Sequence, residues 1–186
     1  MHVNPDHWLA RTRRLPSPNC DARSDPSEIS LIVVHGISLP PGKFGSGMID
    51  RLFLNELDTA TASELADLEG LEVSSHLLID RRGRCTQYVP FDRRAWHAGA
   101  SSWRGRPGCN DFAIGIELEG TDARRYTAAQ YRRLVLVTDA LFDIYPRLAP
   151  DAIVGHFEIA SGRKTDPGPS FDWSRYLLSL TRSAIR

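Results

Sequence analysis

Short runs of aliphatic, often β-branched residues constrain the fold of this 186-residue chain more than any other feature of its sequence. Each run is short enough to be a strand rather than a buried helix. In residues 113–119, Ile114, Ile116 and Leu118 alternate with glycine and glutamate, so the two faces of this strand carry different side chains. The predicted strands are 31–34, 73–79 and 85–89 as a hairpin, 113–119, and 153–156.

Segments with apolar residues at helical spacing lie between and after these strands. Thr127 and Gln130 form a capping box, which predicts the start of a helix whose apolar stripe continues to Tyr145. Similar spacing predicts helices over 48–57 and 174–184. Because helices and strands do not alternate strictly, we predict an α/β (α+β) fold with a mixed central β-sheet flanked by helices.

The length of the chain suggests one domain over residues 1–186, with a mobile insertion at 40–70. The first 30 residues are polar and are expected to wrap the surface. The 23 basic and 23 acidic residues cancel, which gives no reason to expect a nucleic acid or an anionic membrane as partner. A secretory signal is not evident at the N-terminus, and the aliphatic run 31–34 is far too short to span a bilayer.

Three cysteines, Cys20, Cys85 and Cys109, form no CxxC pair, so a cysteine-based zinc site is not expected. An odd number of cysteines without a signal sequence is typical of free thiols in a reducing cytosol. These features together predict a cytoplasmic protein.

Two histidines lie where short apolar strands are expected to end. His35 and His156 could be structural, as a lone histidine usually is, but Asp166 lies in a loop that Pro167 and Pro169 stiffen. Two histidines and one carboxylate form the three-ligand pattern of a catalytic zinc site, with the fourth position open. The alternative for Asp166 is an ordinary turn aspartate, because Asp-Pro-Gly is common turn chemistry.

Two charged residues are candidates for catalysis beside such a site. Glu117 lies in a hydrophobic strand, where a carboxylate is either solvated on an open face or serves as a general base. Lys164 is one of only two lysines among the 23 basic residues, and it could stabilise an oxyanion or simply lie on the surface.

Residues 96–99 (Trp-His-Ala-Gly) combine an aromatic ring, a titratable ring and a glycine in a predicted loop. Trp96 and His97 could form the wall of a cleft that binds a sugar or a peptide, although Trp96 could instead pack in the core. His76 is expected to hydrogen-bond in or near the sheet rather than bind metal.

Several stretches together resemble the zinc amidases related to a phage lysozyme and to the peptidoglycan recognition proteins. Within this family, the chain is most similar to the cytoplasmic amidases that act on 1,6-anhydro-N-acetylmuramyl-L-alanine. The most specific stretches are 33–35, 37–42, 94–99, 109–112, 115–122 and 163–169.

The resemblance implies that His35, His156 and Asp166 bind zinc, that Glu117 is the catalytic base and that Lys164 is the oxyanion partner. It also implies a mixed sheet with the site in a groove at one edge. The implied reaction is hydrolysis of the amide bond between a muramic lactyl group and L-alanine in cytoplasmic muropeptides. The implied partner is thus an anhydro-muramyl peptide, bound by a monomer during peptidoglycan recycling.

Three departures from the family pattern concern peptide recognition rather than chemistry. Well-known members carry Asn where this chain has Gly36, and Arg where it has Glu72 and Gly108. Those arginines help to hold the acidic stem peptide. The stretch 62–64 also lacks the usual aromatic residue.

Action on intact cell wall rather than on anhydro fragments is disfavoured, because a secretory signal is not evident. Two further alternative functions remain from the sequence. A peptidoglycan-fragment binding module without catalysis is one, although such proteins typically lack a zinc ligand. A general zinc peptidase is the other, although the chain has no HExxH motif.

Overall fold

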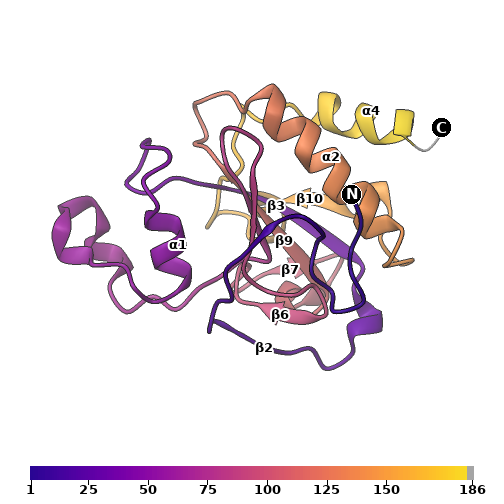
Figure 1. Cartoon of the computed structure of the whole chain (residues 1–186), viewed down its shortest axis with the longest axis horizontal. Coiled ribbons are helices and arrows are strands. Elements are labelled where there is room, and N and C mark those ends of the chain that lie inside the picture. Colours follow the sequence, from indigo (N-terminus) through magenta and orange to yellow (C-terminus); the bar gives the residue numbers. More distant parts are fainter. Residues whose placement is uncertain (184–186) are drawn as a thin grey trace.

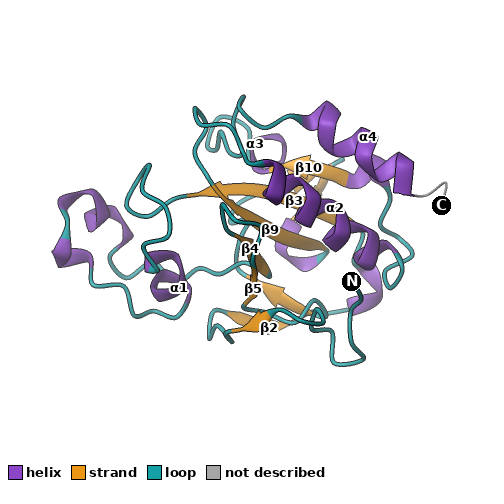
Figure 2. Ribbon diagram, turned by 45° about the horizontal axis from the view of Figure 1, so that its top comes forward, coloured by secondary structure: helices purple, strands orange, loops and turns teal. Residues whose placement is uncertain are grey.

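The computed structural model describes residues 1–183 and shows a six-stranded mixed sheet with helices on its faces (Figures 1 and 2). The strand order is β1-β5-β4-β9-β3-β10, in which only β4 and β5 pair antiparallel. This confirms the mixed sheet flanked by helices.

The strands of the sheet are β1 (Arg13–Arg14), β3 (Leu31–Ile37), β4 (Leu77–Ile79), β5 (Cys85–Gln87), β9 (Ala113–Glu119) and β10 (Ile153–Gly155). Two small two-stranded sheets are formed by β2 (Cys20–Ala22) with β6 (Arg93–Ala95) and by β7 (Ser102–Trp103) with β8 (Arg106–Pro107). The α-helices are α1 (Met48–Phe53), α2 (Ala128–Phe142), α3 (His156–Ile159) and α4 (Trp173–Ser183). The 3-10 helices are Pro26–Glu28, Thr59–Thr61, Ser63–Leu68, Cys109–Asp111 and Pro150–Ala152.

Helices α2 and α4 pack side by side over one face of the sheet (Figures 1 and 2). Ile114, Ile116 and Leu118 of β9 point into this layer and are fully buried, as their alternation in the sequence predicts. Helix α2 begins at the predicted capping box: the Thr127 hydroxyl accepts from the Gln130 amide, and the Gln130 side chain accepts from the Thr127 amide. The opposite face of β9 therefore carries Gly115, Glu117 and Glu119.

Several local predictions differ from the structure. The strand predicted at 73–79 begins only at Leu77. The helix at 48–57 ends at Phe53, where the chain turns, and the predicted final helix extends over Trp173–Ser183, with residue 184 outside the described residues. The first 30 residues do more than wrap the surface, because Leu9 and Ile29 are buried in the core and β1 forms an edge of the main sheet. The average composition of this segment is polar, so its few buried apolar residues do not stand out in the sequence.

Residues 40–70, predicted as a mobile insertion, connect β3 to the region before β4 and include α1 and two 3-10 helices (Figure 1). Leu52, Phe53 and Leu65 anchor this segment in an apolar cluster that also includes Leu78 of β4 and Tyr88. None of the helices within residues 1–183 combines the length and the apolar character that a membrane span requires.

Candidate metal centre and active site

Strand register places His35 beside Glu117. Strands β3 and β9 are parallel, and His35 is the register partner of Glu117, so both side chains leave the same face of the sheet. His35 lies inside β3 rather than at its end, since the pairing continues to Ile37 and Glu119. The α2–α4 layer covers the other face, which leaves this face free for polar groups.

His156 and Asp166 join this face from the neighbouring strand and loop. In β10, Gly155 pairs with Val34 of β3, so His156 follows at the level of His35 and begins α3. The loop that carries Asp166 is docked, because the Asp166 carbonyl accepts from the Phe157 amide at 3.1 Å. Its carboxylate also accepts from the Gly36 amide at 3.3 Å.

The donor atoms of His35, His156 and Asp166, here called the His-His-Asp cluster, have the spacing of metal ligands. The two Nδ1 atoms lie 3.0 Å apart, and Asp166 Oδ2 lies 3.2 Å from Nδ1 of His156 and 3.4 Å from Nδ1 of His35. A tetrahedral zinc ion with ligands at about 2.0–2.1 Å requires donor atoms about 3.3 Å apart. The residues present therefore fit zinc, with three protein ligands and one open position.

The surroundings of His35 and Asp166 favour the protonation states in which these two side chains bind a metal. Burial lowers the pKa of His35 from 6.5 to about 4, so its imidazole is neutral at pH 7. Burial opposes ionisation of Asp166, but its close contacts with His156 and His35 outweigh this effect and hold the pKa of this carboxyl below its ordinary value. Neutral imidazole nitrogens and a carboxylate are the forms that bind metal.

Glu117 is a buried acid beside this cluster. Its side chain is 8% exposed, and Oε2 has no hydrogen-bond partner among the described residues. Burial raises the pKa of Glu117 well above 4.5, the charge of Asp166 adds to this effect, and the Lys164 ammonium opposes it. A carboxyl group with a raised pKa and a free oxygen is suited to accept and return a proton.

Lys164 is exposed, and its positive charge acts to lower the pKa of both Glu117 and His35, so it lies within electrostatic range of both. A cavity of about 490 Å³ begins at Lys164 and Thr165 and extends along the aromatic side chains of Phe157, Phe171 and Trp173. Lys164 lines this cavity, whereas neither Glu117 nor a residue of the cluster is among its lining residues.

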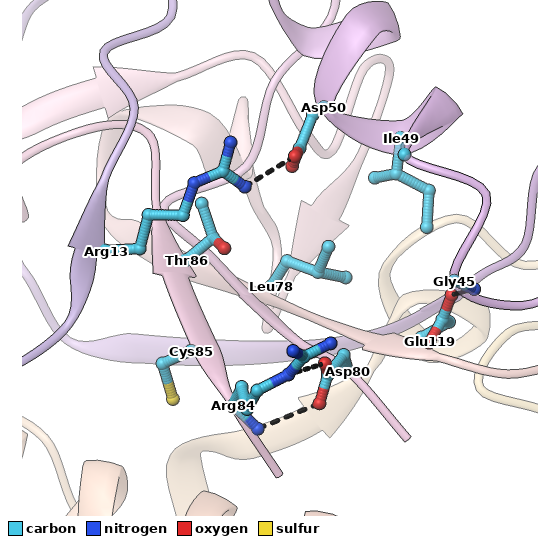
Figure 3. A pocket seen from close by; sticks show the side chains of 11 residues that line it. Arg13, Gly45, Ile49, Asp50, Leu78, Asp80, Arg84, Cys85, Thr86 and Glu119 are labelled. Carbon is cyan, nitrogen blue, oxygen red and sulfur yellow. Dashed lines mark hydrogen bonds and ion pairs between the residues drawn. The ribbon is translucent and has the colours of Figure 1, made fainter. Parts of the chain in front are cut away.

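A second cavity of about 290 Å³ lies further along the same face of the sheet (Figure 3). Leu78, the register partner of Glu117, lines it together with Glu119. Figure 3 shows that its other charged residues form ion pairs with one another, Arg13 with Asp50 at 2.6 Å and Arg84 with Asp80 at 2.5 Å. These pairs leave little charge to attract an ionic ligand.

The predicted cleft residues Trp96 and His97 follow β6. His97 contacts the cluster, whereas the Trp96 backbone is hydrogen-bonded to Ser74. Nδ1 of His97 is 2.9 Å from Nε2 of His35. His35 is buried and His97 is half-buried. The indole Nε1 of Trp96 is buried without a hydrogen-bond partner within residues 1–183. A role for both residues in substrate binding stays a prediction.

Two positions near the cluster were not identified from the sequence. Asn110 holds the loop after β6, since its side-chain oxygen accepts from the amides of His97 and Ala98. Gly115 leaves room for the His97 ring, because a Cβ at this position would lie 2.5 Å from Cγ of His97. The only sequence signal for Gly115 was its position on the same strand face as Glu117. His76 hydrogen-bonds within the sheet as predicted, where Nδ1 accepts from the Gly115 amide.

Gly36, Glu72 and Gly108, which depart from the family pattern, have the following surroundings in the structure. A Cβ at Gly36 would lie 2.4 Å from the Tyr126 hydroxyl. Glu72 is exposed and lines a small cavity of about 140 Å³. The arginines nearest in sequence to Gly108 are paired elsewhere, Arg104 with Asp151 and Arg106 with Glu28.

Comparison with known proteins gives consistent results. A family model described as N-acetylmuramoyl-L-alanine amidase matches residues 25–169. The chain is 55% identical to the 1,6-anhydro-N-acetylmuramyl-L-alanine amidase AmpD of Citrobacter freundii, over 95% of this chain and 94% of that protein. It is 53% identical to the amidase of the same name from Escherichia coli K12, over 94% of this chain and 95% of that protein.

Solved structures agree with the sequence relatives. A crystal structure of an AmpD derivative superimposes with a TM-score of 0.93 at 54% identity, covering 97% of this chain and 99% of that chain. The amidase AmiD from E. coli, in complex with the substrate anhydro-N-acetylmuramic acid-L-Ala-D-γ-Glu-L-Lys, superimposes with a TM-score of 0.61 at 30% identity, covering 87% of this chain and 60% of that chain.

Proposed function

Because the chain belongs to the N-acetylmuramoyl-L-alanine amidase family and is a hydrolase of this class, we propose that it is zinc-dependent and cleaves anhydro-muramyl peptides of the cytoplasm. The bond cleaved is the amide between the lactyl group of 1,6-anhydro-N-acetylmuramic acid and L-alanine. The single observation that carries this proposal is the geometry of the His-His-Asp cluster, whose donor atoms lie 3.0–3.4 Å apart beside Glu117.

Zinc bound by His35, His156 and Asp166 would act as a Lewis acid that polarises the scissile carbonyl and lowers the pKa of the attacking water. Glu117 accepts a proton from this water as its oxygen attacks the lactyl carbonyl carbon. The oxygen of that carbonyl takes up negative charge, which the Lys164 ammonium stabilises.

Glu117 then returns the proton to the amide nitrogen while the carbon–nitrogen bond breaks. The products are a muramic lactyl carboxylate and a peptide with a free L-alanine amine. The buried, unpartnered Oε2 of Glu117 supports this role, because a carboxyl group of raised pKa can hold the proton between the two steps.

The substrate class follows from the relatives. AmiD was crystallised with an anhydro-muramyl tripeptide, and the family members that share 49–55% identity with this chain carry the anhydro-muramyl substrate in their names. We expect the sugar or peptide to contact Trp96 and His97 and to extend into the cavity beside Lys164.

We further propose that the protein acts in peptidoglycan recycling in the cytoplasm. It would do so as a single-domain monomer, without a nucleic acid or a membrane as partner. Catalytic relatives favour this hydrolase over a peptidoglycan-fragment binding module. A binding module of that kind typically lacks one of the zinc ligands, whereas this chain has all three residues of the His-His-Asp cluster.

The test is mass spectrometry of the products from anhydro-muramyl-tripeptide, with and without a chelator. We expect free tripeptide and anhydro-N-acetylmuramic acid, formed only when zinc is present. A plain tripeptide with an acetylated N-terminus is the matched control, and it should remain uncut. Cleavage that persists after exhaustive chelation would contradict zinc dependence, and equal cleavage of the control would indicate a general peptidase.

A further inference from the structure

A histidine beside the cluster, His97, points its Nδ1 at the outer nitrogen of His35. Nδ1 of His35 faces the cluster, and its Nε2 lies 2.9 Å from Nδ1 of His97. Two nitrogen atoms at this distance share one proton, so one ring donates and the other accepts.

Groups on both sides of the ring compete for the single ring proton of neutral His35. On the cluster side, Asp166 Oδ2 lies 3.4 Å and His156 Nδ1 lies 3.0 Å from Nδ1, and either can accept a proton there. On the outer side, His97 can accept the proton at Nε2. Only the second arrangement leaves the Nδ1 lone pair free for a metal, and the total charge of the ring is the same in both.

The His97 ring is held in place for this contact. The Asn110 side-chain oxygen accepts from the backbone amides of His97 and Ala98 at 3.1 and 2.8 Å. The ring lies against Gly115, where a Cβ would approach Cγ of His97 to 2.5 Å. The Ala98 carbonyl lies 3.4 Å from Nε2 of His156, so the same short segment also faces the outer nitrogen of the second cluster histidine.

We propose that His97 is a positioning residue for the metal site: it accepts the Nε2 proton of His35, which fixes the tautomer of His35 and presents Nδ1 to the metal. This inference rests on the proposed function and deepens it. Outer partners of this kind usually are carboxylates or carbonyls, and they change metal affinity about 10–100-fold when they are removed. Here a second histidine takes their place.

The first test reads the tautomer directly in the metal-free full-length protein. Two-bond ¹H–¹⁵N correlation spectra distinguish the protonated from the unprotonated ring nitrogen of each histidine at neutral pH. The unaltered chain should show His35 protonated at Nε2. In His97→Leu the proton should move to Nδ1, toward Asp166, whereas His97→Asn should restore the original pattern because its amide oxygen occupies the place of Nδ1.

The second test measures zinc affinity by competition with a chelator. We expect His97→Leu to weaken zinc binding about 10–100-fold and His97→Asn to retain most of it. The matched control is His7→Leu, which removes a different histidine, one whose Nδ1 lies 2.7 Å from the Tyr145 hydroxyl. It should leave both readouts unchanged.

Gly115→Ala gives a second perturbation that keeps His97 in the chain, and it carries the test if His97→Leu does not fold. The added methyl should displace the ring from His35 and reproduce the tautomer change and the loss of affinity. The proposal is wrong if His35 keeps its tautomer in both His97→Leu and Gly115→Ala, or if His97→Asn behaves like His97→Leu in both measurements. Failure of the unaltered chain to bind zinc would contradict the proposed function instead, because the tautomer result does not depend on zinc.

Discussion

Replacing Glu117 with glutamine should make the zinc-loaded enzyme inactive and, at the same time, make the metal-free protein more stable. Glu117 is 8% exposed, its Oε2 has no partner among the described residues, and burial raises its pKa well above 4.5. Burying a carboxylate costs more than burying an amide of the same shape. The free energy of unfolding should therefore rise when the charge is removed.

The magnitude follows from proton linkage. In the folded state Glu117 holds its proton to higher pH than in the unfolded state, so its contribution to stability is full below pH 4.5 and is lost as pH rises. Each pH unit between 4.5 and 7 costs at most about 1.36 kcal/mol, which limits the loss at pH 7 to about 3.4 kcal/mol. A gain of about 1–3 kcal/mol in Glu117→Gln corresponds to a rise in Tm of about 2–12 °C for a chain of this length.

The assay is thermal unfolding of both metal-free proteins between pH 4.5 and 7.5. The difference in Tm should be small at pH 4.5 and should grow as the pH rises. The matched control is Glu119→Gln on the same face of β9, where the carboxylate accepts from the Gly45 and Arg81 amides at 2.5 and 3.2 Å. This variant loses bonds to a charged acceptor and should have a lower Tm. A Tm difference for Glu117→Gln that is zero or negative at pH 7.5 would refute the reasoning.

Three further predictions concern metal, catalysis and substrate length. Purified protein should hold about one zinc per chain; elemental analysis should find it retained in Glu117→Ala, with turnover reduced about 10²–10⁴-fold, and lost in His35→Ala. Lys164→Met should lower kcat about 10²–10³-fold without releasing zinc, and an unchanged kcat would exclude it as the oxyanion partner. Because Glu72 and Gly108 replace arginines of known relatives, tripeptide substrates should be preferred over dipeptides only slightly, and mainly through a lower KM. Kinetics on both substrates should show that this preference increases in Glu72→Arg. A preference of orders of magnitude in the unaltered chain would contradict this prediction.

Local patterns in the sequence were sufficient for several elements of the fold. The alternation in 113–119 predicted β9 and the side chains on each of its faces, and the Thr127–Gln130 capping box predicted the start of α2. The hairpin of β4 and β5 is also confirmed. These features depend on neighbours within a few residues, which is why the sequence displays them.

The sequence does not show whether a nearby arginine takes over the role of the arginines that relatives carry at positions 72 and 108. Arg104 and Arg106 lie close to Gly108 in the chain, but each is paired with an acid distant in sequence, Asp151 and Glu28. Both pairs are largely exposed, so solvent screens them and a ligand could still compete for either arginine.

The sequence by itself determined which residue types are available for chemistry: two histidines, an aspartate in a proline-stiffened loop, and a glutamate on the polar face of a buried strand. Only the tertiary structure decided that they meet. Parallel pairing of β3 with β9 and β10 brings together His35, Glu117 and His156, and loop packing adds Asp166 and His97. Register and loop docking arise from contacts between residues up to 131 positions apart, such as His35 with Asp166, and no local pattern encodes such contacts.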